Sequence, residues 1–112
     1  MSMEVDMPKY LIKASYTAEG AKGLMKAGGT ARRAAVQKMI EGLGGKLETF
    51  YFAYGADDVF GICDLPDAAS VIAASLVINA SGAVRSSTTP LIAPEEVDAA
   101  CKKSPEYRAP GA

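Results

Sequence analysis

The chain has 112 residues, 49% of them hydrophobic and 22% charged, which is typical of one globular domain and excludes a disordered or fibrous protein. Its net charge is −1 and no basic stripe is present, so we expect no nucleic-acid partner. Histidine is absent, which removes His-based acid–base catalysis and the commonest ligand of zinc and haem.

The first residues, 1–7, are predicted to form a flexible N-terminus, and translation has possible starts at Met1, Met3 and Met7. They lack the basic start and apolar run of a secretory signal. The longest uncharged stretch, residues 68–84, is interrupted by polar residues and is too short to span a bilayer. We therefore expect a soluble, cytoplasmic protein without a membrane partner.

Residues 8–16 alternate between two faces and predict a first strand. Two helical segments follow, separated by Gly28 and Gly29, with Thr17 as the predicted N-cap of the first and Thr30 of the second. The second segment has an apolar stripe of Val36, Met39, Ile40 and Leu43. Its opposite, polar side is predicted to carry Arg32, Arg33, Gln37, Lys38 and Glu41.

Two further strands are predicted at 46–54 and 58–64, joined as a hairpin by the turn at 55–57. In the first of them, the pattern predicts Phe50, Phe52 and Tyr54 on one side, and on the other side Leu47, Thr49, Tyr51 and Ala53. A helix from Asp67 to Asn79 follows, with Asp67 as N-cap and Gly82 as terminator. A strand at 83–92, placed at the sheet edge because of Pro90, and a helix at 94–103 complete the domain.

This order predicts an α+β fold of ferredoxin-like βαββαβ topology, with a four-stranded antiparallel sheet in the domain 8–103 and a flexible C-terminal tail at 104–112. Right-handed crossovers put both connecting helices on one face of the sheet. The other face then exposes Leu11 and part of the second and third strands, so we expect a second copy to cover it in a homodimer.

The helix at 68–79 has no charged residue on any side. A helix that is apolar all round is normally buried on both sides. This pattern favours a second interface and an assembly larger than a dimer; alternatively, its alanines and serines tolerate water. The residues do not decide between these two interpretations.

The chain resembles the GYD-domain family, small bacterial proteins with a dimeric α+β barrel-type fold, in four segments: MPKYLIKASYT, EGLGGK, FYFAYGADDVFGICDLPD and NASGAVRSSTTPLIAPEEVD. The resemblance covers about residues 7–103 and implies the fold, without implying a reaction or a cofactor. The Gly-Tyr-Asp turn that names the family corresponds to Gly55, Asp57 and Asp58. Asp57 departs from the tyrosine, so no role of a phenol at that position carries over.

The adjacent carboxylates Asp57 and Asp58 are candidates for ligand binding or proton transfer, with Asp58 as the candidate catalytic residue. Asp and Gly are also common turn formers, so a purely structural role is the alternative. Two carboxylates alone make a poor metal site, and Cys63 and Cys101 lack metal-ligand spacing, so we expect neither metal nor cofactor. Cys63 is interpreted as a small buried hydrophobe.

Lys13 and Arg85 lie in the middle of predicted strands and are candidates for binding a small anion; alternatively, they face solvent or pair with Asp57, Asp58 or Asp64. Tyr10, Tyr16, Tyr51 and Tyr54 are candidates for lining a pocket with their hydroxyls; packing in the core is the alternative for most of them.

Three functions stay open: a homo-oligomeric module that binds a small, partly apolar or anionic ligand in the sheet cleft; a cofactor-independent enzyme acting on a small carbonyl or aromatic compound; or a structural self-assembling protein.

Overall fold

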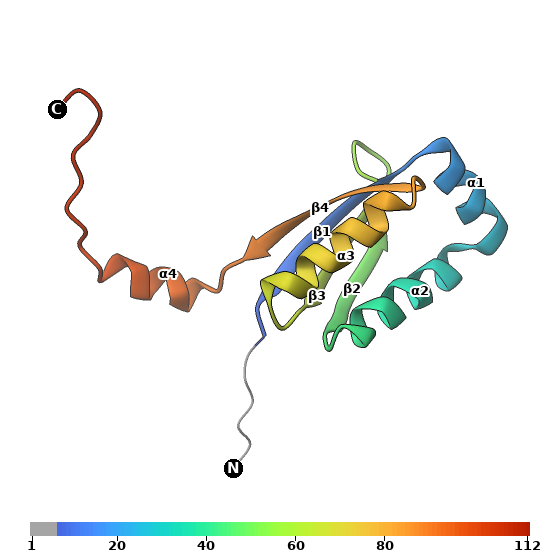
Figure 1. The fold of residues 1–112 in the computed structure, drawn as a ribbon, viewed down its shortest axis with the longest axis horizontal. Helices are drawn as coiled ribbons and strands as arrows, with labels where there is room; N and C mark the ends of the chain where they lie inside the picture. Colours follow the sequence, from blue (N-terminus) through green and yellow to red (C-terminus); the bar gives the residue numbers. More distant parts are fainter. Residues whose placement is uncertain (1–6) are drawn as a thin grey trace, which may run out of the picture.

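The computed structural model describes residues 7–112, so the predicted flexible N-terminus and the starts Met1 and Met3 lie outside the described residues, apart from Met7. The chain runs through eight elements in the order β1, α1, α2, β2, β3, α3, β4 and α4 (Figure 1). The strands are β1 (Lys9–Tyr16), β2 (Lys46–Phe52), β3 (Val59–Asp64) and β4 (Val84–Leu91). The helices are α1 (Ala18–Ala27), α2 (Gly29–Gly42), α3 (Ala68–Ala80) and α4 (Pro94–Cys101).

The four strands form one antiparallel sheet in the order β2-β3-β1-β4. This confirms the predicted ferredoxin-like arrangement, and β4 is an edge strand as Pro90 indicated. Pro90 does not end the strand, because β4 continues to Leu91. Within residues 7–112, no helix has the length and apolar character needed to cross a membrane.

The helix ends follow the predicted signals at most positions. The side chain of Thr17 accepts a hydrogen bond from the Gly20 amide at 3.3 Å, and that of Asp67 accepts one from Ser70 at 2.8 Å. The prediction of Thr30 as a cap was wrong, because α2 already begins at Gly29. Gly28 lies between α1 and α2 and has a φ of 89°. Residues with a side chain rarely adopt a positive φ, so glycine suits this change of chain direction.

Alternate side chains of β1 divide the sheet into two faces. Tyr10, Ile12 and Ala14 pack with buried residues of the core on the face that α2 and α3 cover. The core has two clusters, one of Ala14, Val59 and Val84 and one of Ile40, Cys63 and Leu65. The prediction that Cys63 is a buried hydrophobe is confirmed, since its exposure is 0%.

We call the other side of the sheet the open face, because none of the packed helices in residues 7–112 covers it. By the alternation of the strands it carries Lys9, Leu11, Lys13, Ser15, Lys46, Thr49, Tyr51, Phe60, Ile62, Asp64, Arg85, Ser87, Thr89 and Leu91. Phe60 and Leu91 are 37% and 38% exposed, and Tyr51 is 69% exposed. The predicted uncovered face is therefore present.

A register shift in β2 corrects one predicted side-chain direction. Leu47 was predicted to share a face with Thr49 and Tyr51, but it packs on the core side, as Phe50 does. The pairing with β3 is irregular between Leu47 and Thr49, and an extra residue there inverts the alternation. The strand also ends at Phe52, so Tyr54 lies in the hairpin loop.

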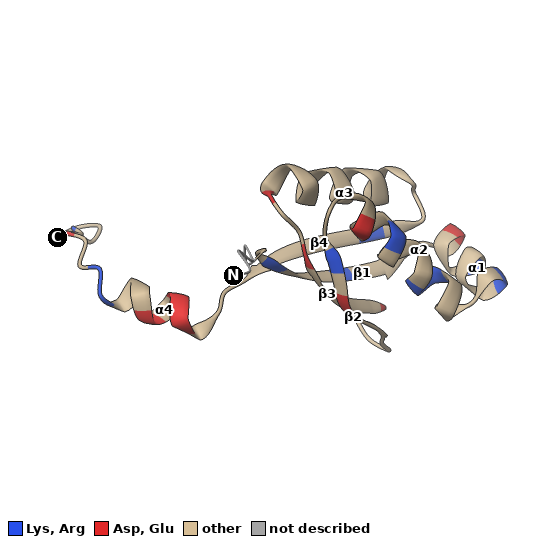
Figure 2. Cartoon of the chain, turned by 90° about the horizontal axis from the view of Figure 1, so that it is seen from below, with Lys and Arg blue, Asp and Glu red and all other residues tan. Residues whose placement is uncertain are grey.

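The helix α3 contacts the sheet on one side and leaves an apolar side uncovered. Ile72, Leu76 and Val77 are 56%, 66% and 65% exposed. Figure 2 shows that charged residues are absent along the helix after Asp67. The expectation of a second interface on this helix stays a prediction.

The chain after β4 stands apart from the packed domain (Figure 1). Every residue of α4 is exposed, and residues 104–112 form no helix or strand. The last helix ends at Cys101, two residues before its predicted end. We call residues 92–112 the C-terminal arm.

Gly20 is the point where α1 meets the sheet end, and it supplies a test of the packing. A Cβ atom at Gly20 would overlap the carbonyl oxygen of Ala83, which also accepts a hydrogen bond from the Thr17 amide at 3.0 Å. We predict that Gly20→Ala lowers the free energy of unfolding by about 1–3 kcal/mol, as overpacked substitutions do.

The matched control for this prediction is Gly23→Ala in the same helix. A Cβ atom at Gly23 has no neighbour within 4 Å, so this change is expected to stabilise the protein by about 0.5–1 kcal/mol. Urea unfolding followed by circular dichroism measures both. Equal effects of the two substitutions would contradict the close contact at Gly20.

Candidate functional site

Most of the predicted site residues lie in two places, the open face and the β2–β3 hairpin loop. Lys13, Tyr51 and Arg85 lie on the open face, where Arg85 pairs with Ser15 and Lys13 with Ser87 on adjacent strands. Tyr54, Asp57 and Asp58 lie in the loop, and Tyr54 is fully exposed.

Asp58 joins the hairpin loop to β1. Its Oδ2 accepts a hydrogen bond from the Tyr16 amide at 2.9 Å, and its own amide donates to the Ala14 carbonyl at 2.8 Å. The half-buried Asp58 is thereby held by backbone groups, as the structural interpretation of this turn expected.

The cations Lys13 and Arg85 have no ion-pair partner among residues 7–112. Asp64, one of the predicted partners, instead binds Lys9 at 2.9 Å, and Glu48 binds the same ammonium group at 3.3 Å. The hydrogen bond that Lys9 donates to Asp64, and to a smaller extent the one that it donates to Glu48, raises the pKa of Lys9 against the effect of desolvation. Lys13 and Arg85 are thus open-face cations that lack a bound carboxylate within the described part of the chain, and Lys46 at the edge strand β2 is another.

A large hollow of the domain lies on the opposite side of the sheet, between α1, α2 and α3. It has a volume of about 450 Å³, within the range of small-molecule sites. The small residues of α1 and α2 leave this space unfilled. They are Gly20, Gly23 and Ala27 in α1 and Ala31 and Ala35 in α2. We call this hollow, together with the smaller cavity beneath it, the helix–sheet groove.

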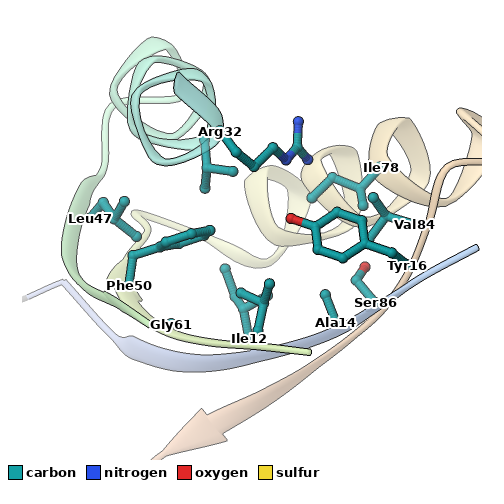
Figure 3. Close-up of a pocket in the computed structure, with 12 residues that line it drawn as sticks. Ile12, Ala14, Tyr16, Arg32, Leu47, Phe50, Gly61, Ile78, Val84 and Ser86 are labelled. Atoms are coloured by element: carbon teal, nitrogen blue, oxygen red, sulfur yellow. The ribbon is translucent and has the colours of Figure 1, made fainter. Parts of the chain in front are cut away.

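The smaller cavity is about 30 Å³, room for one or two water molecules, and lies directly against the sheet. The two hollows share four lining residues, Tyr16, Arg32, Ile78 and Val84, so they lie next to each other. The deep part is lined mainly by apolar side chains, among them Ile12, Leu47 and Phe50 (Figure 3).

Arg32 is the cation at the junction of the two hollows. Figure 3 shows its side chain leaving α2 and extending over the groove toward the ring of Tyr16 and toward Ile78 of α3. The residue is half-buried, and within residues 7–112 its guanidinium has neither an ion pair nor a hydrogen bond. Beside it, the hydroxyls of Tyr16 and Ser86 offer polar groups in an otherwise apolar space.

The sequence-based interpretation placed Arg32 on the polar side of its helix, and the structure corrects this. Arg32 lies four residues before Val36, and residues at this spacing share one side of a helix. Both residues line the groove. The spacing from Arg32 to Val36 and Ile40 was the signal that could have identified the residue.

The groove contains Tyr16 but none of the predicted site residues Lys13, Tyr51, Tyr54, Asp57, Asp58 and Arg85. Among residues 7–112 there is also no group of three or more Cys, Asp or Glu side chains arranged to hold a metal ion. The groups that the groove does contain are an apolar lining, one guanidinium and two hydroxyls, which can chemically accommodate an apolar group together with an anion.

Comparison with known proteins identifies a family. The family model of the GYD domain matches residues 10–101, which covers β1 through α4. No curated protein and no solved structure matches the chain.

The bonds of Asp58 predict a difference between the two adjacent carboxylates. Asp58→Ala leaves the half-buried Tyr16 amide without its acceptor, so we expect the free energy of unfolding to fall by about 1–3 kcal/mol. Asp57→Ala, the control, removes a side chain with no hydrogen bond in the described residues and is expected to change it by less than about 0.5 kcal/mol. Chemical denaturation measures both, and a larger loss at Asp57 would contradict the role given to Asp58.

The two cysteines are predicted to differ in reactivity. Burial raises the pKa of Cys63 to about 11, with the Asp64 charge as a smaller cause, whereas Cys101 is exposed. At pH 8 only about one in a thousand Cys63 thiols is ionised, and the thiolate is the reactive form.

Iodoacetamide is therefore expected to alkylate Cys101 in the folded protein and both cysteines after unfolding in urea. Mass spectrometry of the digested protein assigns the labelled site. Equal labelling of the two cysteines in the folded state would contradict this prediction.

Proposed function

The chain belongs to the GYD-domain family, and we propose that it is a self-associating module that binds a small, partly apolar anion in the helix–sheet groove. The observation that carries this proposal is the half-buried residue Arg32, whose guanidinium is unpaired in residues 7–112 and lies beside a mainly apolar hollow of about 450 Å³. A ligand that meets both features has an apolar body and one anionic group.

The cost of partly burying a charge supports an anionic ligand. A guanidinium that is removed from water loses its hydrogen bonds to water. A carboxylate or a similar anion replaces them with charge-assisted, often bidentate hydrogen bonds. Tyr16 and Ser86 add hydroxyl donors near the same place. Glu19, an exposed carboxylate of α1, lines another part of the groove, so repulsion from it favours the anionic group at the Arg32 side.

The apolar lining supports the remainder of the ligand. Ile12, Leu47 and Phe50 line the deep part of the groove, and Leu24 and Met39 the wider part. Burying apolar ligand surface contributes about 25 cal/mol per Å² before the costs of association. A medium-length chain or a single ring therefore gains more here than a small polar anion.

The open face supports the self-association. Tyr51, Phe60 and Leu91 are exposed there, next to the partly buried Leu11 and Ile62. Contiguous apolar surface of this kind marks an interaction site more often than a free surface. A second copy of the chain, related by a twofold axis, covers this face.

Octanoate provides a direct test of the groove, because it combines an eight-carbon chain with one carboxylate. We expect isothermal titration calorimetry to detect its binding, and Arg32→Gln to weaken the affinity by at least about tenfold, as the loss of a charge-assisted hydrogen bond does. Arg33→Gln, one position along on the exposed side of the same helix, is the matched control and is expected to change the affinity less than twofold.

Octanamide, which has the same chain without the charge, separates the two parts of the proposal. Weaker binding of octanamide to the native protein, with no further loss in Arg32→Gln, agrees with a guanidinium–carboxylate contact. Failure of octanoate and of a matched aromatic carboxylate, phenylacetate, to bind at millimolar concentration would overturn the proposed ligand class.

A further inference from the structure

The C-terminal arm, residues 92–112, exposes apolar side chains that its own domain does not cover. The radius of gyration of the chain is 17.5 Å, whereas a compact chain of this length has about 13 Å. Ile92, Val97 and Tyr107 of the arm are 64%, 51% and 79% exposed. An eight-residue helix is marginal in water on its own, so α4 needs a packing surface.

The helix α4 has one apolar side and a strongly acidic remainder. Val97 and Cys101 are four residues apart and therefore lie on the same side. Glu95, Glu96 and Asp98 give the helix three carboxylates (Figure 2), none of them in an ion pair within residues 7–112. Its chemistry fits a surface that combines apolar groups with unpaired cations.

The open face is such a surface. It exposes Phe60 and Tyr51 among its apolar groups, and its cations Lys13 and Arg85 have no ion-pair partner in the described part of the chain. The arm continues directly from β4, the edge strand that carries Arg85, and runs away from its own sheet (Figure 1). A chain therefore presents both surfaces without joining them to each other.

We propose that the C-terminal arm of one chain docks on the open face of a second copy, with the apolar side of α4 against the sheet and its carboxylates beside Lys13 and Arg85. The exchange is reciprocal in a twofold dimer, because each chain contributes one arm and one face. This inference rests on the self-association within the proposed function and names the segment that the partner contributes. It is independent of the ligand in the groove.

Cross-linking through Cys101 tests the contact in the full-length protein. Cys101 is the exposed thiol of the arm, and Cys63 is buried. Chains labelled with ¹⁴N and ¹⁵N are unfolded together, refolded, and treated with a short maleimide–succinimide reagent that joins a thiol to a lysine amine. We expect mixed-isotope peptides that join Cys101 to Lys13 or Lys9 of the open face.

Two outcomes of the cross-linking would overturn the inference. Cross-links that join Cys101 to Lys9 or Lys13 only within peptides of the same isotope would mean that the arm folds back on its own chain. Mixed-isotope cross-links only to Lys22, Lys26 or Lys38, which lie on α1 and α2, would place the arm on the helices of the partner.

A matched pair of substitutions in α4 supplies the second test. Val97→Asp puts a carboxylate on the apolar side, and we expect it to raise the dimer dissociation constant, measured by analytical ultracentrifugation, at least tenfold. Ala99→Asp puts the same carboxylate two positions along, away from that side, and is expected to change the constant less than twofold. Equal dissociation constants of the two variants and the native chain would overturn the docking of α4.

Light scattering of the native chain separates this inference from the proposed function. A native dimer without arm contacts to the open face would refute the arm contact and leave the self-association standing. A native monomer at micromolar concentration would refute both, whereas the Arg32 test of ligand binding is unaffected by either result.

Discussion

The confinement of the packed helices to one face of the sheet is the constraint on which the rest of the structure depends. It follows from two crossover connections of the same hand, one through α1 and α2 and one through α3. The side chains on the helix-covered face of the sheet form the hydrophobic core. The apolar and cationic side chains on the open face are not covered by the packed helices within residues 7–112. The open face and the helix–sheet groove are therefore two consequences of the same topology.

The groove exists because the covering layer is incomplete. Gly20 lets α1 approach the Ala83 carbonyl closely, and the small residues Ala27, Ala31 and Ala35 do not fill the space toward α3. Larger side chains at these positions would close the hollow and bury more apolar surface. The chain instead leaves about 450 Å³ open and directs the guanidinium of Arg32 over it. An unfilled hollow beside a cation lowers the packing density of the domain. Such a loss of packing is expected of a binding site more than of a purely structural core.

The sequence predicted those features that local chemistry determines. Thr17 and Asp67 cap their helices, Gly28 separates α1 from α2, and the alternation in β1 separates the two faces of the sheet. The predictions failed where one residue changes the register or where the side of a helix depends on its neighbours. The irregular pairing in β2 moved Leu47 to the core, and the gap between α2 and α3 drew Arg32 toward the groove.

The predicted site residues illustrate the same limit. Lys13, Arg85 and Tyr51 were selected because polar or aromatic groups in strands need a partner, and they lie together on the open face. The reasoning located a surface that needs covering and expected a ligand cleft between sheet and helices, but these three residues do not line the hollow on that side of the sheet. A cavity arises from side chains that are too small, and the sequence carries no direct signal for the space that they leave.

The strand β1 connects the two surfaces, since its alternate residues serve both. Ile12, Ala14 and Tyr16 line the groove, and Leu11 and Lys13 lie on the open face. A substitution in β1 that shifts the strand backbone is therefore expected to alter both surfaces, so its effects cannot be assigned to one of the two proposed roles. Arg32 on α2 and Val97 on α4 each belong to a single surface, so changes at these two positions separate the roles of the groove and of the arm.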